Sequence, residues 1–246
     1  MNNQTNITEN GYNEANLLYV QSAMSEFCEC AGCTARLKKV NDRAILTVTF
    51  SDCYKEIIRS EIADKIAEII AIKYKYDFFK QEISVSGLKK IEKEILLASL
   101  IAADLDDDKK YSFSRLMTFD DFAIDGVFNF RLKPLKKKWI DVCSYIPNCF
   151  LTSQLRDFIR FLLENKKKRV YIEGGRVYDA HFRRLKRSTL LGGEGVEILR
   201  EVLLSNCGEI ELSGNIPEDD EKYLREYYTD KITFLPTKEK EQKYLH

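Results

Sequence analysis

The chain has 246 residues, 44% of them hydrophobic, and its 39 basic and 39 acidic residues give a net charge of zero. Such a chain can bury a sizeable core in one large domain or two small ones, and its neutral charge argues against a molecule that binds polyanions over its whole surface. It has no run of the ~18 apolar residues that a membrane span needs, and its polar N-terminus does not resemble a signal peptide. We therefore predict a cytoplasmic protein without membrane contact, whose seven cysteines are reduced thiols.

The N-terminal part of the sequence predicts a polar tail followed by a small α+β unit over residues 16–86. The predicted elements are, in order, a disordered tail (1–15), a strand (17–20), a helix that begins at Met24, a strand (43–50) and a long helix (51–79). Alternating β-branched residues indicate the second strand. The long helix is indicated by a stripe of isoleucines, namely Ile58, Ile62, Ile66, Ile69 and Ile70.

Residues 87–166 are predicted to form a helical middle segment. Gly87 breaks the chain, and helices are predicted over 88–103, over 112–122, from about 127 and from 152. The acidic run at 104–110 (DLDDDKK) is interpreted as a solvated connection, because it lacks the glycine and the distant glutamate of a calcium-binding loop.

The most distinctive stretch is Ile124–Cys143, which contains the only tryptophan. Pro134 within it indicates a helix start or a kink. In a helical conformation one face would be buried against the helix at 155–162, and that face consists of Phe128, Leu132, Leu135 and Trp139. Phe130 would then point elsewhere, whereas an extended conformation would bury Phe128 and Phe130 together.

Residues 167–236 predict a hairpin followed by a βαβ unit. Two short alternating runs, 169–173 and 176–180, flank Gly174-Gly175, which favours a type I′ turn. A helix (196–206), a strand (209–213), a helix (218–228) and a last strand (232–235) follow, and their spacing favours parallel pairing. Residues 237–246 are predicted to be a solvated tail, so the whole chain is assigned to the α+β class.

The segment Asp125–Lys133 (DGVFNFRLK) resembles a segment of the YtxC-like family of sporulation proteins from endospore-forming bacteria. That family shows a similar glycine, two aromatic residues, Arg and Leu, followed by a helix like 155–163, a hairpin like 170–180 and a closing helix–strand pair. The similarity is best over 120–236, and Lys136–Lys138 departs from the mixed charges of the family. The resemblance implies an association with sporulation and identifies no catalytic residue.

Three cysteines are the best candidates for a metal site: Cys28, Cys30 and Cys33. Thiolates at this spacing bind zinc or an iron–sulfur cluster from a loop, but on a helix Cys28 points about 200° away from Cys30. The apolar neighbours favour a helix, so we predict no bound metal and no cofactor.

Catalytic chemistry finds little support in the sequence. The only histidines are His181 and His246, and no nucleophile motif accompanies either of them. The run Gly192–Gly195 opens a predicted helix and could hold an anion on its backbone N–H groups, but it follows no clear strand and is interpreted as a linker.

Basic residues gather in two segments, 131–138 and 166–187. The candidate binding residues in them are Arg131, Lys133, Lys166, Lys167, Lys168, Arg169, Arg183 and Arg184. Tyr171 and Tyr178 lie among the cations of the second segment, and such interleaving can hold phosphates and stack bases. A solvated surface explains the same charges and fits the neutral net charge.

Arg131 allows two interpretations. It can be a half-buried ion-pair partner of Asp125 or Asp121, or it can face a ligand. We favour the structural role, because two acids are near in sequence.

The residues and the resemblance together favour a sporulation-associated protein that acts by interaction with an unidentified protein partner and not by catalysis. The alternative is a nucleic-acid-binding protein that uses 131–138 and 166–187, and an enzyme is the third hypothesis. Both basic segments on one face would favour nucleic-acid binding, whereas a deep pocket that holds a carboxylate with a perturbed pKa would favour an enzyme.

Overall fold

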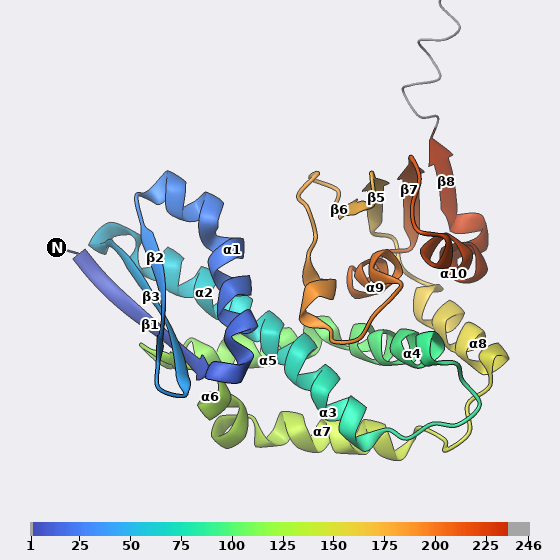
Figure 1. Ribbon diagram of the computed structural model, residues 1–246, viewed down its shortest axis with the longest axis horizontal. Helices are drawn as coiled ribbons and strands as arrows, with labels where there is room; N and C mark the ends of the chain where they lie inside the picture. The colour runs from blue at the N-terminus through green and yellow to red at the C-terminus, as the bar shows by residue number, and fades with distance from the viewer. Residues whose placement is uncertain (1, 236–246) are drawn as a thin grey trace, which may run out of the picture. The chain divides into compact units, whose positions relative to one another are not determined.

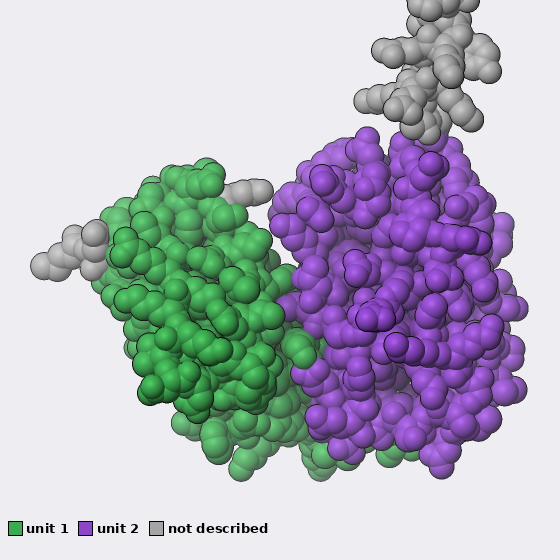
Figure 2. Space-filling view, in the orientation of Figure 1, with its two compact units in different colours: residues 1–75, 105–144 green, residues 76–104, 145–246 purple. Residues whose placement is uncertain are grey.

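The computed structural model describes residues 2–235. The predicted α+β class is confirmed, because the described chain forms two four-stranded sheets and many helices. It divides into two compact units (Figure 2). The first unit holds residues up to Lys75 together with Leu105–Ser144, and the second holds Tyr76–Asp104 together with the residues from Tyr145 onward. None of the described helices is long and apolar enough to cross a membrane.

The sheet of the first unit has the strand order β2-β3-β1-β4, with β3 antiparallel to β1 and β2, and with β4 parallel to β1 (Figure 1). Its strands are β1 (Asn2–Asn10), β2 (Thr34–Val40), β3 (Arg43–Ser51) and β4 (Phe122–Ala123). Every second side chain of β3, from Ala44 to Phe50, is buried. The alternating strand predicted at 43–50 is therefore confirmed.

The predicted disorder of residues 1–15 is wrong, because Asn2–Asn10 forms the strand β1 between β3 and β4. Ile7 and Glu9 point into the core, whereas Thr8 is more exposed on the other face. A polar composition predicts disorder only for a chain without a partner strand. Here β3 pairs with the whole length of β1, and the alternating polar side chains suit a half-buried strand.

Helices of the first unit pack on this sheet or on one another. They are α1 (Glu14–Ala31), α2 (Lys55–Ile69), α5 (Leu105–Leu116), α6 (Ile124–Arg131) and α7 (Lys133–Ser144), with the short turns η1 (Gly11–Asn13), η2 (Asp52–Tyr54) and the π-helical η3 (Ile70–Tyr74). α1 contacts the strands and α2, and α2 contacts α5. The isoleucine stripe predicted for α2 is buried, as expected.

Two predictions of local structure in this unit are wrong. Residues 17–20 belong to α1 and not to a strand, because Leu17 and Val20, three residues apart, lie on the buried face of a longer helix while Leu18 is exposed. The acidic run at 104–110 is not a solvated connection, since α5 begins within it and Asp108 is buried. The Asp108 carboxylate binds Nζ of Lys75 at 2.7 Å and accepts the indole N–H of Trp139 at 2.8 Å. These partners lie far away in sequence, so local composition did not reveal them.

The stretch Ile124–Cys143 forms the two helices α6 and α7, with a break at Leu132. Pro134 is the second residue of α7, where the missing N–H costs no intrahelical hydrogen bond. The proline therefore marks a helix start, one of the two outcomes that the sequence allowed.

The helical register predicted for this stretch is confirmed. The residues expected on one face are all buried, namely Phe128, Leu132, Leu135 and Trp139, whereas Phe130 is 74% exposed. The ring of Phe128 lies 4.5 Å from that of Tyr74 and 5.7 Å from that of Trp139, measured between centroids. The helix predicted to cover this face, at 155–162, belongs to the second unit.

The sheet of the second unit has the order β6-β5-β7-β8. Its strands are β5 (Arg169–Glu173), β6 (Arg176–Tyr178), β7 (Glu209–Ser213) and β8 (Ile232–Leu235). The predicted hairpin is confirmed, because β5 and β6 are antiparallel and Gly174 and Gly175 both have positive φ, 55° and 74°. The predicted parallel pairing of β7 with β8 is confirmed as well. The solvated tail predicted at 237–246 lies outside the described residues.

The second unit is layered (Figure 1). Its helices are α3 (Lys75–Glu82, whose first residue belongs to the first unit), α4 (Lys90–Ala103), α8 (Thr152–Leu163), α9 (Glu197–Leu204) and α10 (Glu218–Tyr228), with the short turns η4 (Arg187–Leu190) and η5 (Thr229–Lys231). α9 and α10 lie against the sheet, α4 and α8 pack on them, and α9 is buried along most of its length between these layers.

The boundaries between the two units differ from those predicted at 86/87 and 166/167. The predicted helical middle, 87–166, does not form one body, because α5, α6 and α7 belong to the first unit and α4 and α8 to the second. Side-chain contacts illustrate the division. Asp108 of α5 is bound to Lys75, whereas Thr152 at the start of α8 hydrogen-bonds Glu92 of α4 at 3.1 Å. Helices that follow one another in the chain thus pack in different units.

Candidate functional site

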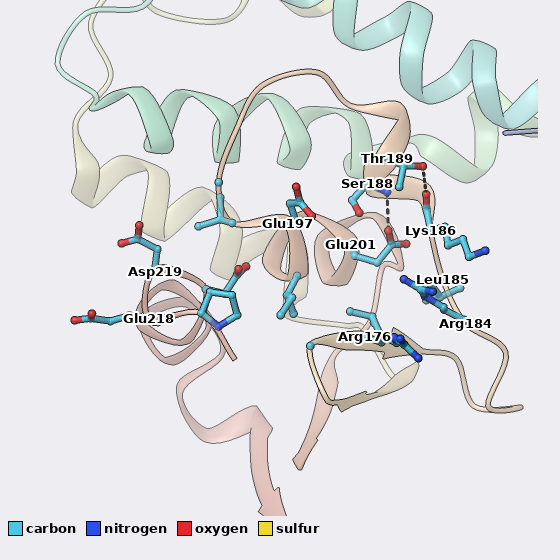
Figure 3. Close-up of a pocket in the computed structure, with 17 residues that line it drawn as sticks. Arg176, Arg184, Leu185, Lys186, Ser188, Thr189, Glu197, Glu201, Glu218 and Asp219 are labelled. Carbon is cyan, nitrogen blue, oxygen red and sulfur yellow. Dashed lines mark hydrogen bonds between the residues drawn. The ribbon is translucent and has the colours of Figure 1, made fainter. Parts of the chain in front are cut away.

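A pocket of about 530 Å³ opens in the second unit (Figure 3). Its lining residues come from the end of the β5–β6 turn and the edge strand β6 (175–177), and from the loop that follows β6 (184–186, 188 and 189). The other lining residues come from the start of α9 (195–198) together with Glu201, and from the start of α10 (217–220). Pockets of ~300–1,000 Å³ are typical of small-molecule sites, so this one is large enough for a ligand.

A glycine-rich turn shapes the start of α9. Gly193 and Gly195 have φ of 83° and 84°, and Val196 adopts the left-handed value of 46°, which a β-branched residue rarely takes. Oδ1 of Asp220 accepts the backbone N–H of Leu199 at 2.8 Å. The sequence allows a bound anion at this helix start, held by backbone N–H groups. In the structure the carboxylate of Asp220, from α10, accepts one of these N–H groups instead. The run predicted as a linker contributes to the pocket wall.

Glu201 of α9 lines the pocket and is only 2% exposed. Its Oε2 accepts the backbone N–H of Ser188 at 2.6 Å (Figure 3). Its Oε1 is buried and has no hydrogen-bond partner among the described residues. Burial raises the pKa of the Glu201 carboxyl, and donors from the Arg187–Ser188 segment offset part of that effect. A buried carboxylate oxygen without a donor destabilises the ionised form, so Glu201 favours a proton or a donor from a ligand.

Charged side chains of opposite sign line different parts of the pocket (Figure 3). The basic side holds Arg176, Arg184 and Lys186, and the acidic side holds Glu218 and Asp219 in the first turn of α10. Within residues 2–235, the side chains of the three cations form no ion pair or hydrogen bond. The pocket therefore offers unpaired positive charge beside the buried Glu201 on one side, and the exposed carboxylates of α10 on the other.

Arg184 is the predicted binding residue that the structure brings into this pocket. Its neighbour Arg183 does not line the pocket and instead pairs with Asp179 at 2.8 Å. Arg176 and Lys186 belong to the second basic segment but are not among the predicted binding residues. The position of Arg176 directly after Gly174-Gly175, at the start of an edge strand, is the signal that could have found it.

The remaining candidates in the second basic segment lie elsewhere. Arg169 bridges Glu209 at 2.7 Å and Glu211 at 2.6 Å on the neighbouring strand β7. Lys166–Lys168 connects α8 to β5, and the carbonyl of Lys168 accepts the backbone N–H of Gly208 at 2.8 Å. The positive charge of Arg169 is thus largely satisfied within the sheet.

Arg131 and Lys133 belong to the first unit and are exposed on either side of the break between α6 and α7. The ion pair predicted for Arg131 is wrong, because Asp125 binds Arg43 and Asp121 accepts a backbone N–H from β1. The guanidinium of Arg131 lies 6.0 Å from the centre of the Phe119 ring instead.

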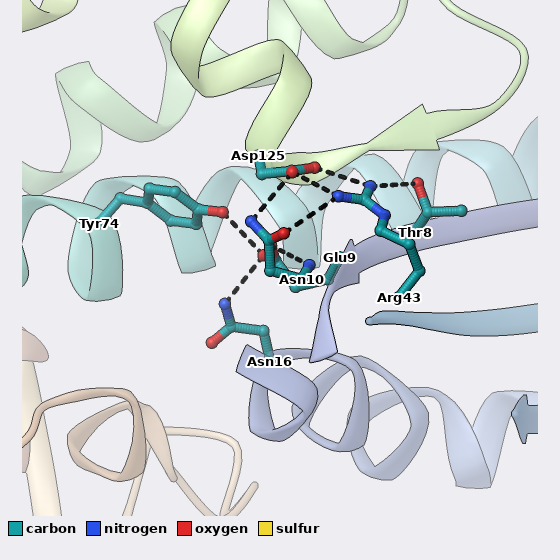
Figure 4. A network of polar contacts seen from close by, with 7 residues as sticks. All are labelled: Thr8, Glu9, Asn10, Asn16, Arg43, Tyr74 and Asp125. Atoms are coloured by element: carbon teal, nitrogen blue, oxygen red, sulfur yellow. Dashed lines mark hydrogen bonds and ion pairs between the residues drawn. The ribbon is translucent and has the colours of Figure 1, made fainter. Parts of the chain in front are cut away.

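The most extensive polar network of the first unit surrounds Asp125 and Glu9 (Figure 4). Arg43 donates to both oxygens of Asp125, at 2.5 and 3.0 Å, and this holds the pKa of Asp125 below its ordinary value. Glu9 is fully buried, and it accepts the hydroxyl of Tyr74 at 2.8 Å and the amide of Asn16 at 3.1 Å. Burial raises the pKa of both Glu9 and Tyr74. Every carboxylate oxygen here has a donor, so we assign the network a structural role.

Aromatic side chains form a second feature of the second unit, beside the pocket. Tyr171 and Tyr178 are directly opposite each other in the β5–β6 pair, and Tyr178 also faces Arg184 across an isolated bridge. Phe182 stacks on Tyr171 with 4.6 Å between ring centroids and is 67% exposed. We call Tyr171, Tyr178 and Phe182 the aromatic face. Because residues opposite each other in an antiparallel pair share a face, the cation of Arg184 lies on the same side.

The cysteine candidates do not form a metal site. Cys28 and Cys30 lie on α1, as predicted, and Cys33 follows the end of that helix. Burial raises the pKa of Cys28 and Cys33, whose thiols are hydrogen-bonded to each other. Over the part of the chain that the structure describes, no group of three or more His, Cys, Asp or Glu side chains could hold a metal ion.

No family model, no curated protein and no solved structure matches this chain.

Glu201 is the site residue that sequence reasoning missed. The helical pattern places Val196, Leu199 and Val202 inward and thus leaves Glu201 on the outward side. The loop at 184–189 covers that side, so the helix is buried all round. An acid within the largely apolar run 196–204 is the sequence signal that could have identified Glu201. Its burial could not be predicted, because the loop that covers it lies outside the helix and helical periodicity does not describe loops.

Proposed function

We propose that the chain acts by binding and not by catalysis, and that the pocket of the second unit recognises an anionic group. The observation that carries the proposal is the set of three unpaired cations on one side of the pocket, Arg176, Arg184 and Lys186. Like charges that line the same side repel one another, and a bound anion removes this cost. Arginine suits the task, because its guanidinium donates two parallel hydrogen bonds to a carboxylate or a phosphate.

Catalysis is the weaker candidate, although a pocket that holds a buried carboxylate of raised pKa is the feature that favours an enzyme. One oxygen of Glu201 is already held by the backbone of Ser188. General acid–base or nucleophilic catalysis needs a second reactive group in reach, and His181, the only histidine among the described residues, does not line the pocket. A carboxylate that the Ser188 backbone holds in a fixed orientation is suited to binding a ligand.

The setting that we propose for this binding is sporulation, and the support is the resemblance of Asp125–Lys133 to the YtxC-like family. An endospore-forming host that lacks the gene should form fewer heat-resistant spores, and an unchanged spore count would contradict this setting. The protein partner suggested by the sequence remains part of the proposal, with affinity capture from sporulating cells as its test.

The anion proposal predicts that Arg184→Gln weakens the binding of inorganic phosphate or citrate by about tenfold, the effect of losing one charge-assisted hydrogen bond. Isothermal titration calorimetry at low salt measures this loss. Arg183→Gln is the matched control. It removes the same charge from the neighbouring residue, whose side chain pairs with Asp179 and does not line the pocket. Equal losses in the two variants would point to general surface charge, and absence of anion binding to the wild-type chain would refute the proposal.

The second candidate function is the binding of single-stranded nucleic acid, and the aromatic face favours it. Exposed aromatic rings next to a cation are the platform on which bases stack, at about 1–3 kcal/mol for each base. Phe182→Ala should weaken the binding of a short oligonucleotide by about fivefold or more, measured by fluorescence anisotropy in a salt series. Substitution of Lys166, Lys167 and Lys168 with Gln should flatten the salt dependence. No binding of RNA or DNA at low salt would exclude this candidate.

A further inference from the structure

Glu201 gives the pocket a feature that recognition of a simple anion does not require. Figure 3 shows its carboxylate next to Ser188, on the side of the pocket that holds Arg184 and Lys186. Oε2 is held by the Ser188 backbone, so the orientation of the carboxyl group is set by the chain itself. Oε1 has no donor among the described residues, although three cationic side chains line the same pocket.

An oxygen of this kind marks a position for a donor. Buried polar atoms nearly always have a hydrogen-bond partner, so each exception needs an explanation. Among the described residues, the side chains of Tyr111, Ser112, Arg200 and Tyr227 also hold a buried atom without a partner, but none of these four residues lines the pocket. The carboxylates of Glu9, Asp125 and Asp108 all have partners on both oxygens. Glu201 differs from them in lining a pocket, where a ligand can supply the missing donor.

We propose that the ligand of this pocket is a small zwitterionic molecule, with an anionic group bound by Arg176 and Arg184 and an amino or amidino group that donates to Glu201. This inference rests on the proposed function and names the ligand class for the same pocket. The charges agree with it, because the carboxylates of Glu197, Glu218 and Asp219 also line the pocket and disfavour a ligand that carries only negative charge. The volume of about 530 Å³ accommodates a molecule larger than a bare phosphate or acetate ion.

Matched pairs of probes test the inference, because the members of each pair differ in the amino group. O-phosphoethanolamine against ethyl phosphate tests a phosphate as the anionic group, and glutamate against glutarate tests a carboxylate. In calorimetric titrations of the wild-type chain, the aminated member of at least one pair should bind about tenfold more tightly, as expected for a hydrogen bond between charged groups. The pair that shows the preference identifies the anionic group.

Variants test whether Glu201 causes the preference for the aminated probe. Glu201→Gln should reduce the preference to about twofold or less, whereas Glu173→Gln, which removes an exposed acid of the same unit that does not line the pocket, should keep it. Arg184→Gln should weaken both members of a pair equally. Thermal unfolding establishes that each variant folds, and the wild-type comparison decides the question even if Glu201→Gln does not fold.

The outcomes separate this inference from the proposed function. Equal binding of both members of each pair to the wild-type chain, with loss in Arg184→Gln, would overturn the zwitterion and leave the anion site standing. A preference that survives in Glu201→Gln would assign the donor contact to another residue and overturn the role of Glu201. Absence of binding for all four probes and for inorganic phosphate would refute both.

Discussion

At the scale of single residues, the described interior holds acids with different environments. Asp108 binds Lys75, a residue 33 positions earlier, and both side chains are almost fully buried. Glu201 accepts the N–H of Ser188, 13 positions earlier, and keeps one oxygen without a donor. Asp108 lies in an acidic run and Glu201 in a largely apolar one, and the burial of each depends on a segment outside its own helix. Periodicity describes one helix at a time and could not predict either residue.

The environment of Glu201 predicts a pH dependence of stability. Its pKa is raised above the ordinary value of 4.5, so the folded chain holds a proton that the unfolded chain releases. Its stabilising contribution is full below pH 4.5 and is lost as the pH rises through the folded pKa. The free energy of unfolding of the wild-type chain, relative to Glu201→Gln, should fall with rising pH by about 1.4 kcal/mol for each pH unit between the two pKa values.

Urea denaturation of both chains at several pH values measures this difference. Glu218→Gln serves as the control, because Glu218 is exposed on the same pocket. If Glu218→Gln differs from the wild-type chain by the same pH-dependent free energy of unfolding, the effect comes from surface charge and not from burial of Glu201. A difference that does not change with pH would mean that burial does not perturb Glu201.

At the scale of elements, the local sequence is sufficient to predict a helix or strand whose structure depends on one segment of the chain. The hairpin at Gly174-Gly175 follows from two positive φ angles that glycine adopts easily. The β7–α10–β8 unit follows from spacing and handedness. β1 and the start of α5 were missed for the opposite reason, since their polar residues are ordered by partners that lie elsewhere in the chain.

The pair α6 and α7 predicts a contrast between two phenylalanines. Phe128 is 8% exposed and contacts two aromatic rings, whereas Phe130 is 74% exposed. Phe128→Ala should lower the free energy of unfolding by about 3 kcal/mol or more, as truncations of buried Phe do. Phe130→Ala should change it by less than about 1 kcal/mol. Urea denaturation of the two variants decides the matter, and a larger loss for Phe130→Ala would contradict the register of these helices.

At the scale of the whole molecule, each unit combines segments that are not adjacent in the chain. The first unit needs Leu105–Ser144 in addition to its N-terminal segment, and the second needs Tyr76–Asp104. Boundaries predicted from composition follow the order of the chain and therefore missed this exchange. Long-range partners such as Asp108 for Lys75 are the physical cause, since a buried lysine needs its counter-charge.

This arrangement predicts the behaviour of fragments. A fragment of residues 1–86, cut at the boundary that composition suggested, lacks β4, α5, α6 and α7 and leaves Lys75 without Asp108. It should show no cooperative thermal unfolding by circular dichroism. A fragment of residues 1–144 keeps every segment of the first unit and should unfold cooperatively. Cooperative unfolding of the shorter fragment would show that the C-terminal segment of the unit is dispensable.

The interleaving of the two units also has a consequence on the ribosome. Lys75 leaves the exit tunnel well before Asp108, because the 29 residues of Tyr76–Asp104 are made between the two parts of the first unit. At ~5–20 residues per second this interval lasts roughly 1–6 seconds. During that time the sheet lacks β4, and the lysine that is later buried lacks the carboxylate of Asp108. The nascent first unit should therefore be a substrate for ribosome-associated chaperones until residue 144 has emerged.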